Sequence, residues 1–215
     1  LQNFNSAGAE QAQTEYPMAQ QTEVTADNVL KFWLDDCTPA DWYKAEDAFD
    51  DKIRAQFEDA WENLCDGHYS LWLTYPSGAL AYIILADQFS RNMFRGEAKA
   101  FASDRIALAA AKSAIDKGWD LRIDPPARQF FYMPLMHSEN LCDQERCVRL
   151  MCERMNDGGN NLLHARAHRE VIRKFGRFPY RNDALGRSST TLEQSYVEGG
   201  GYRTTVNALE QSEAA

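Results

Sequence analysis

Two histidines of this sequence have neighbours that could support acid–base chemistry, and the first of them is His137. It follows Pro134, which should kink or end a helix, and it precedes Ser138 and Glu139. Irregular backbone within a helical protein often marks a functional position. Imidazole changes its charge near neutral pH, so His137 could act as a general base that Glu139 or Asp87 orients. The alternative is a helix corner in which Ser138 caps the next helix.

The second histidine is His168, which lies four residues after His164 in a segment with a helical pattern. This spacing places both imidazoles on one face of a helix, as in many metal sites, and His168 could also act as a general base. Arg166 and Arg169 raise the positive potential around the pair, which disfavours a bound cation. We therefore expect hydrogen bonding or anion binding here and no metal, with metal ligation by His164 and His168 as the alternative.

Several polar residues follow directly after the most apolar stretch of the chain, residues 79–86. They comprise Asp87, Gln88, Arg91 and Asn92. Asp87 and Arg91 are four residues apart, so they could pair on one face of a helix. Such a pair either fixes the end of a buried helix or lines a polar pocket together with its neighbours.

A loop punctuated by Gly and Pro, residues 175–187, holds Arg177, Arg181 and Asn182 between aromatic residues. Arginine suits the bidentate recognition of carboxylates and phosphates. The alternative is that these arginines pair with the acidic N-terminal half of the chain. The candidate ligand-binding residues are therefore Asp87, Gln88, Arg91, Asn92, His137, Glu139, His168, Arg177, Arg181 and Asn182.

The composition argues against several classes of partner. The 215 residues carry a formal net charge of −9, and the first 70 hold 15 acidic side chains against four basic ones. An acidic chain without a large basic patch is not typical of nucleic-acid binders. The longest apolar stretch is far shorter than the roughly 18 residues that a membrane-spanning helix needs. We therefore expect neither nucleic acid nor a membrane as a partner.

The cysteine count and the first 25 residues favour a cytoplasmic location. Five cysteines, an odd number, argue for reduced thiols, and residues 1–25 show neither the basic nor the apolar part of a secretory signal. We also find no phosphate loop or dinucleotide-binding fingerprint, so we expect no cofactor.

Helical signals dominate the chain. A stripe at spacings of three and four residues predicts an amphipathic helix, and it consists of Phe49, Ile53, Phe57, Trp61 and Leu64. Further helices are expected near residues 76–89, 104–117, 124–133, 139–155 and 160–175, and Thr190 with Glu193 forms a capping box for a last short helix. No period-two alternation predicts a sheet. We expect one all-α domain of antiparallel helical hairpins over residues 26–199, a disordered tail before it and a loose tail over residues 200–215.

Several short segments resemble a bacterial family known as domain of unknown function 924, over about residues 28–198. They include Phe32-Trp33, Trp42-Tyr43-Lys44, Asp87-Gln88-Phe89, Phe94-Arg95-Gly96, Tyr132-Met133-Pro134, His137-Ser138-Glu139 and Leu185-Gly186-Arg187. The resemblance implies an all-helical fold similar to a right-handed tetratricopeptide-repeat stack, and it supplies no activity. The family pattern has His at the position of Tyr180 and Pro at that of Ser90.

Two functions compete on this basis. The first is a non-catalytic binding protein whose Arg- and His-lined groove takes an anionic small molecule or the carboxylate of an acidic peptide. The second is a hydrolase in which His137 or His168 is the general base, with metal assistance as a variant.

Overall fold

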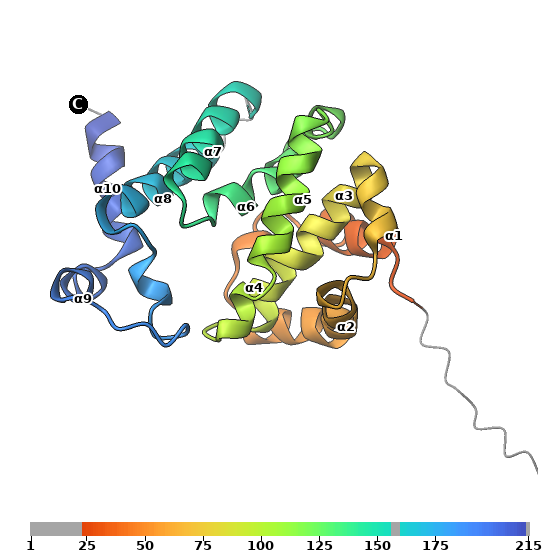
Figure 1. Ribbon diagram of the computed structural model, residues 1–215, viewed down its shortest axis with the longest axis horizontal. Helices are drawn as coiled ribbons and strands as arrows, with labels where there is room; N and C mark the ends of the chain where they lie inside the picture. Colours follow the sequence, from red (N-terminus) through yellow and green to blue (C-terminus); the bar gives the residue numbers. More distant parts are fainter. Residues whose placement is uncertain (1–22, 156–159, 214–215) are drawn as a thin grey trace, which may run out of the picture.

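The computed structural model describes residues 23–155 and 160–213, and within these ranges the chain is all-α, with no strand (Figure 1). Its α-helices are α1 (Ala26–Leu30), α2 (Asp47–Cys65), α3 (Pro76–Ile83), α4 (Ser90–Met93), α5 (Asp104–Asp116), α6 (Met133–Met136), α7 (Leu141–Arg154), α8 (Asn161–Phe175), α9 (Thr191–Glu198) and α10 (Tyr202–Glu213). Short 3₁₀ segments cover Asp41–Tyr43, Ser70–Thr74, Ala98–Phe101, Asp120–Arg122, Ala127–Phe131 and Pro179–Arg181. None of the helices described is long and apolar enough to cross a membrane.

The capping box predicted at Thr190 is confirmed, and α1 starts with a second one. Thr25 forms a capping box with Asn28 at the start of α1, and Thr190 forms one with Glu193 at the start of α9. These side chains satisfy backbone N–H groups that have no partner inside the helix. The predicted disordered tail lies, up to residue 22, outside the described residues.

The N-terminal helices enclose an aromatic core. Phe89 packs against Phe57 with ring centroids 4.6 Å apart and against Trp33 at 5.2 Å. The predicted stripe on α2 faces this core, with Ile53 and Leu64 almost fully buried. Burial of large aromatic rings is the main stabilising contribution in this half of the molecule.

The central helix brings polar side chains into this core. The predicted helix over residues 76–89 runs as α3, widens into a π-helix over Ile84–Phe89 and continues as α4. A π-helical turn accommodates an additional residue and often occurs at functional sites. Asp87 lies in this wider turn and is fully buried. The helix therefore carries a carboxylate into the interior, where it needs partners.

The single helix predicted over residues 124–133 is not what the structure shows in the middle of the chain. A 3₁₀ segment, Ala127–Phe131, leads into the four-residue α6, because Pro134 fits only the first turn of a new helix. Buried Asp120 anchors the segment by accepting hydrogen bonds from Tyr132 Oη and Arg154 Nη1, each at 2.6 Å. This anchor ties α6 to the end of α7.

The C-terminal segment is not the loose tail that the sequence predicted. Residues 202–213 form α10, which packs against α8, and α8 in turn packs against α7 at one end of the molecule (Figure 1). The half-buried residues of α10 follow a helical spacing, namely Tyr202, Thr205, Val206 and Leu209. This stripe was missed because the three preceding glycines suggested the end of the fold.

Candidate functional site

A cavity of about 710 Å³ lies between the N-terminal half and the C-terminal helices. The 3₁₀ turn at Asp41–Tyr43 and the π-helix with α4 form one side, and α6, α8 and α10 form the other. Its apolar wall includes Trp42, Pro126, Met133, Met136 and Tyr202. A cavity of this size and character is typical of small-molecule sites.

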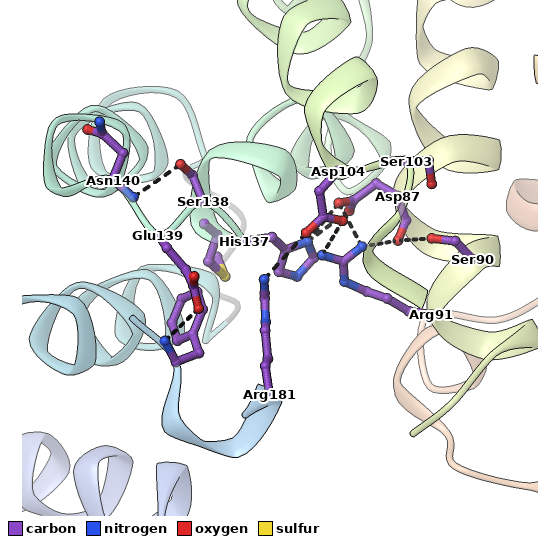
Figure 2. A network of polar contacts seen from close by, with 12 residues as sticks. Asp87, Ser90, Arg91, Ser103, Asp104, His137, Ser138, Glu139, Asn140 and Arg181 are labelled. Carbon is purple, nitrogen blue, oxygen red and sulfur yellow. Dashed lines mark hydrogen bonds and ion pairs between the residues drawn. The ribbon is translucent and has the colours of Figure 1, made fainter. Parts of the chain in front are cut away.

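At the base of the cavity, His137 pairs with Asp87. Its Nδ1 lies 2.9 Å from each carboxylate oxygen of Asp87 (Figure 2). Burial alone would raise the pKa of Asp87, but Arg91 and His137 outweigh it and hold that pKa at about 2. Burial and Arg91 together lower the pKa of His137 despite the carboxylate. At neutral pH the imidazole is therefore uncharged, with its proton on Nδ1, where it donates to Asp87.

Two arginines pair with the carboxylates of Asp87 and Asp104. Arg91 Nη1 donates to the Asp87 carbonyl at 2.8 Å and lies 3.1 Å from its carboxylate, while Arg91 Nη2 lies 2.9 Å from Asp104 as an ion pair. The predicted pairing of Asp87 with Arg91 is thus confirmed. Arg181 Nη1 lies 3.4 Å from Asp104 (Figure 2). Its guanidinium lies over the ring of Phe178, 4.5 Å from the centroid. Both arginines are largely committed to protein carboxylates.

His168 is the second imidazole of the cavity. Its Nδ1 lies 2.9 Å from the backbone carbonyl oxygen of His164, and its ring centroid lies 6.2 Å from that of His137. Burial, and after it the neighbouring His137, lower the pKa of His168 to about 3. His164 Nδ1 lies 2.8 Å from Tyr202 Oη. In the described chain, no three His, Cys, Asp or Glu side chains gather in a group that could hold a metal ion.

Six of the ten predicted ligand-binding residues meet at this site. Gln88, Arg91, Asn92, His137 and His168 line the cavity, and Asp87 lies directly behind His137. Arg181 is buried next to Asp104 rather than on the cavity wall. The remaining three, Glu139, Arg177 and Asn182, belong to a separate network in the C-terminal loop.

That network holds the loop together. Glu139 accepts hydrogen bonds from Arg187 at 2.7 and 3.0 Å and from the Phe178 backbone at 2.8 Å. Arg177 pairs with Glu193 at 2.6 and 2.8 Å. The alternative that these arginines pair with the acidic N-terminal half therefore fails for Arg177, whose partner is Glu193, whereas Arg181 does lie against Asp104, in the first half of the chain. Glu139 also does not orient His137, since it lies apart from the imidazole (Figure 2).

The corner after α6 has a different cap from the one predicted. Asn140 caps α7 by accepting a hydrogen bond from the Cys142 backbone N–H at 2.8 Å. Ser138 instead donates to Asp143 at 2.9 Å. Asparagine is as good an N-cap as serine, and it stands immediately before the helix.

Two residues at the rim of the cavity, Lys44 and Arg95, were not among those predicted from the sequence. Arg95 Nε and Nη2 bind Asp50 at 2.8 and 3.0 Å, and Nη2 also donates to the Lys44 carbonyl at 3.3 Å. Lys44 pairs with Asp41. Both side chains are about half exposed. Their only signal in the sequence was their presence in two of the family-like segments.

The comparisons with known proteins agree with this fold. The model of the family described as bacterial protein of unknown function (DUF924) matches residues 29–201. The chain belongs to the DUF924 family. It is also similar to a solved structure titled protein of unknown function ATU0120 from Agrobacterium tumefaciens, with 36% identity and a TM-score of 0.76. That match covers 81% of this chain and 97% of the other. No curated protein matches the chain.

The DUF924 match extends across the whole candidate site apart from Tyr202. Residues 29–201 contain the Asp87–His137 pair, both rim cations and His168. Tyr202, which contacts His168 with ring centroids 4.6 Å apart, lies immediately after the matched range.

Replacing Glu139 with Gln tests its structural role. Gln can still accept from the Phe178 backbone but loses the ionic pair with Arg187, so we expect a loss of about 1–2 kcal/mol in the free energy of unfolding. Urea denaturation measures it. Unchanged stability combined with altered ligand affinity would contradict the structural role.

The low pKa of His168 predicts a sensitivity to acid. The imidazole titrates near pH 6.5 in the unfolded chain and at about 3 in the fold, so the unfolded state gains the proton first as pH falls. Between pH 7 and pH 5 this residue should cost on the order of 2 kcal/mol of unfolding free energy. His168→Phe should flatten that loss in urea denaturation, while exposed His68→Phe should not. Equal pH profiles for the three proteins would contradict the prediction.

Proposed function

We propose that this DUF924 protein binds a small molecule with an apolar body and an anionic group. The observation that carries the proposal is the cavity of about 710 Å³, which is lined by apolar side chains, partly buried imidazoles and two half-exposed cations. A bounded cavity suits a small molecule better than an acidic peptide, which would need an extended groove.

The wall supports the apolar part of the ligand. Trp42, Met133, Met136 and Tyr202 surround the cavity with aromatic and thioether surface. Methionine side chains adapt to irregular ligand shapes, and aromatic rings stack on flat ones. A planar, largely apolar body therefore fits this part best.

The rim supports the anionic group. Arg95 has bound Asp50 through Nε and Nη2, which leaves Nη1 to donate to a ligand, and Lys44 has further ammonium protons beyond its pair with Asp41. Because each cation already faces a carboxylate, the attraction rests on these directed donors rather than on a net positive charge. Arg91 and Arg181 have fewer N–H groups available for a ligand, since they pair with Asp87 and Asp104.

The repeat-like arrangement of the fold belongs to the same proposal. We propose that the helices form antiparallel hairpins in a right-handed, tetratricopeptide-repeat-like stack, with the cavity on its inner face. The packing of α7 on α8 and of α3 on α5 supports it.

A test uses 6-hydroxy-2-naphthoate, a fluorescent probe that combines a flat apolar body with a carboxylate, and its neutral carboxamide. We expect Lys44→Met to weaken the carboxylate about tenfold, as loss of a charge-assisted hydrogen bond would, and to leave the carboxamide unchanged. Fluorescence titration at low and high salt measures both affinities.

Lys112→Met is the matched control, because Lys112 pairs with Asp143 away from the cavity. It should leave both affinities unchanged. No saturable binding of the carboxylate, or equal weakening of both probes by Lys44→Met, would sink the proposal.

A second candidate function is hydrolysis, and the Asp87–His137 pair favours it. A carboxylate that fixes Nδ1–H leaves Nε2 as a base, as in enzymes where an acid orients a catalytic histidine. Nε2 would remove a proton from water as its oxygen attacks an ester carbonyl, and would return that proton to the departing alkoxide.

Hydrolysis of 4-nitrophenyl butyrate tests this candidate. We expect turnover above the uncatalysed rate, a loss of at least 100-fold in His137→Asn, and no change in His68→Asn. Release of 4-nitrophenolate measures the rate. Turnover that survives His137→Asn would exclude His137 as the base.

A further inference from the structure

We propose that the buried end of this cavity presents hydrogen-bond acceptors to its ligand and therefore selects a neutral donor group, a hydroxyl or an aromatic amine. Three residues form this acceptor end, namely Gln88, His137 and His168, and Asn92 adds a further acceptor nearer the rim, where it shares Asp50 with Arg95. The inference rests on the proposed function, since it specifies the ligand of the same cavity. It goes beyond that function because it assigns a second polar group of the ligand.

The two imidazoles point their lone pairs toward the cavity. The partner of His137 Nδ1 is the Asp87 carboxylate, and the partner of His168 Nδ1 is a backbone carbonyl. Neither partner can donate, so in each neutral ring the proton must sit on Nδ1 and Nε2 must be an acceptor. In the described residues, neither Nε2 forms a hydrogen bond.

The two amides are oriented by the same logic. Gln88 Nε2 donates to Asp87 at 2.6 Å, and Asn92 Nδ2 donates to Asp50 at 2.8 Å. A carboxylate only accepts, so each amide must turn its NH₂ group toward the acid and its oxygen away from it.

Those amide oxygens stay accessible. Gln88 and Asn92 are only 8% and 6% exposed, yet both line the cavity. Neither oxygen is among the buried, unpartnered polar atoms of the described residues, and neither is Nε2 of the two histidines. In the described residues, each of these four cavity-lining side chains therefore has an accessible acceptor atom with no donor bound to it.

The nearby charges exclude a charged head group at this end. Asp87 and Asp104 balance Arg91 and Arg181, and both imidazoles are neutral. A carboxylate placed here would face the lone pairs of Gln88, His137 and His168, and an ammonium would lose its water shell without a net negative partner. A hydroxyl or an aromatic amine donates without carrying a charge.

The cavity thus has two chemically different ends. Donors at Lys44 and Arg95 mark the rim, next to Asn92, and the acceptors of Gln88, His137 and His168 mark the other end. The matching ligand class is a hydroxy- or amino-substituted aromatic carboxylate, bound with its carboxylate outward. A site built from buried acceptors discriminates strongly against an analogue that cannot donate.

The experiment uses four 2-naphthoates that differ only at the 6-position. The hydroxyl and fluoro compounds form one pair, and the amino and methyl compounds form the other, so each pair matches in size. We expect the donor to bind at least tenfold more tightly in both pairs. This preference runs against hydrophobicity, which favours fluorine and methyl.

Variants locate the preference. In His168→Phe, which keeps a ring against Tyr202, the donor preference should fall to threefold or less, whereas His68→Phe should leave it intact. Equal affinities within both pairs of the wild-type protein would overturn the inference, while discrimination against the carboxamide would still support the proposed function. Absence of binding by all four carboxylates would overturn both.

Discussion

The buried carboxylate of Asp87 is the constraint on which the rest of the site depends. It lies in a π-helical turn and is fully buried, and a buried charge without partners is very costly. Gln88, Arg91 and His137 supply those partners, and Arg91 extends the network to Asp104. One carboxylate thereby fixes the relative positions of the central helix, α5 and the chain after α6.

The groups that pair with this carboxylate determine which hydrogen-bonding atoms the cavity presents to a ligand. When a side chain donates its N–H group to a buried acid, that group is no longer available to a ligand. The acceptor atom of the same side chain then faces the cavity. His137 and Gln88 donate in this way to Asp87, and Asn92 donates to Asp50. Arg91, which also lines the cavity, is paired with Asp87 and Asp104, whereas the half-exposed Lys44 and Arg95 at the rim keep N–H donors for a ligand.

Local features could be predicted from the sequence, whereas long-range pairing could not. The i,i+4 pair of Asp87 and Arg91 and the α2 stripe follow from helical periodicity, and the Thr190 cap follows from a local motif. The Asp87–His137 contact spans 50 positions and depends on how the helices pack. The same holds for Lys44 and Arg95, which meet at the rim only in the folded chain.

The protonation pattern of the imidazoles tests the account most directly. The chain has four histidines, so single substitutions can assign their signals in a two-bond ¹⁵N–¹H correlation spectrum at neutral pH. The account predicts that His137 and His168 are neutral, with the proton on Nδ1 and an unprotonated Nε2. A proton on Nε2 of either ring, or a charged imidazolium at His137, would contradict it.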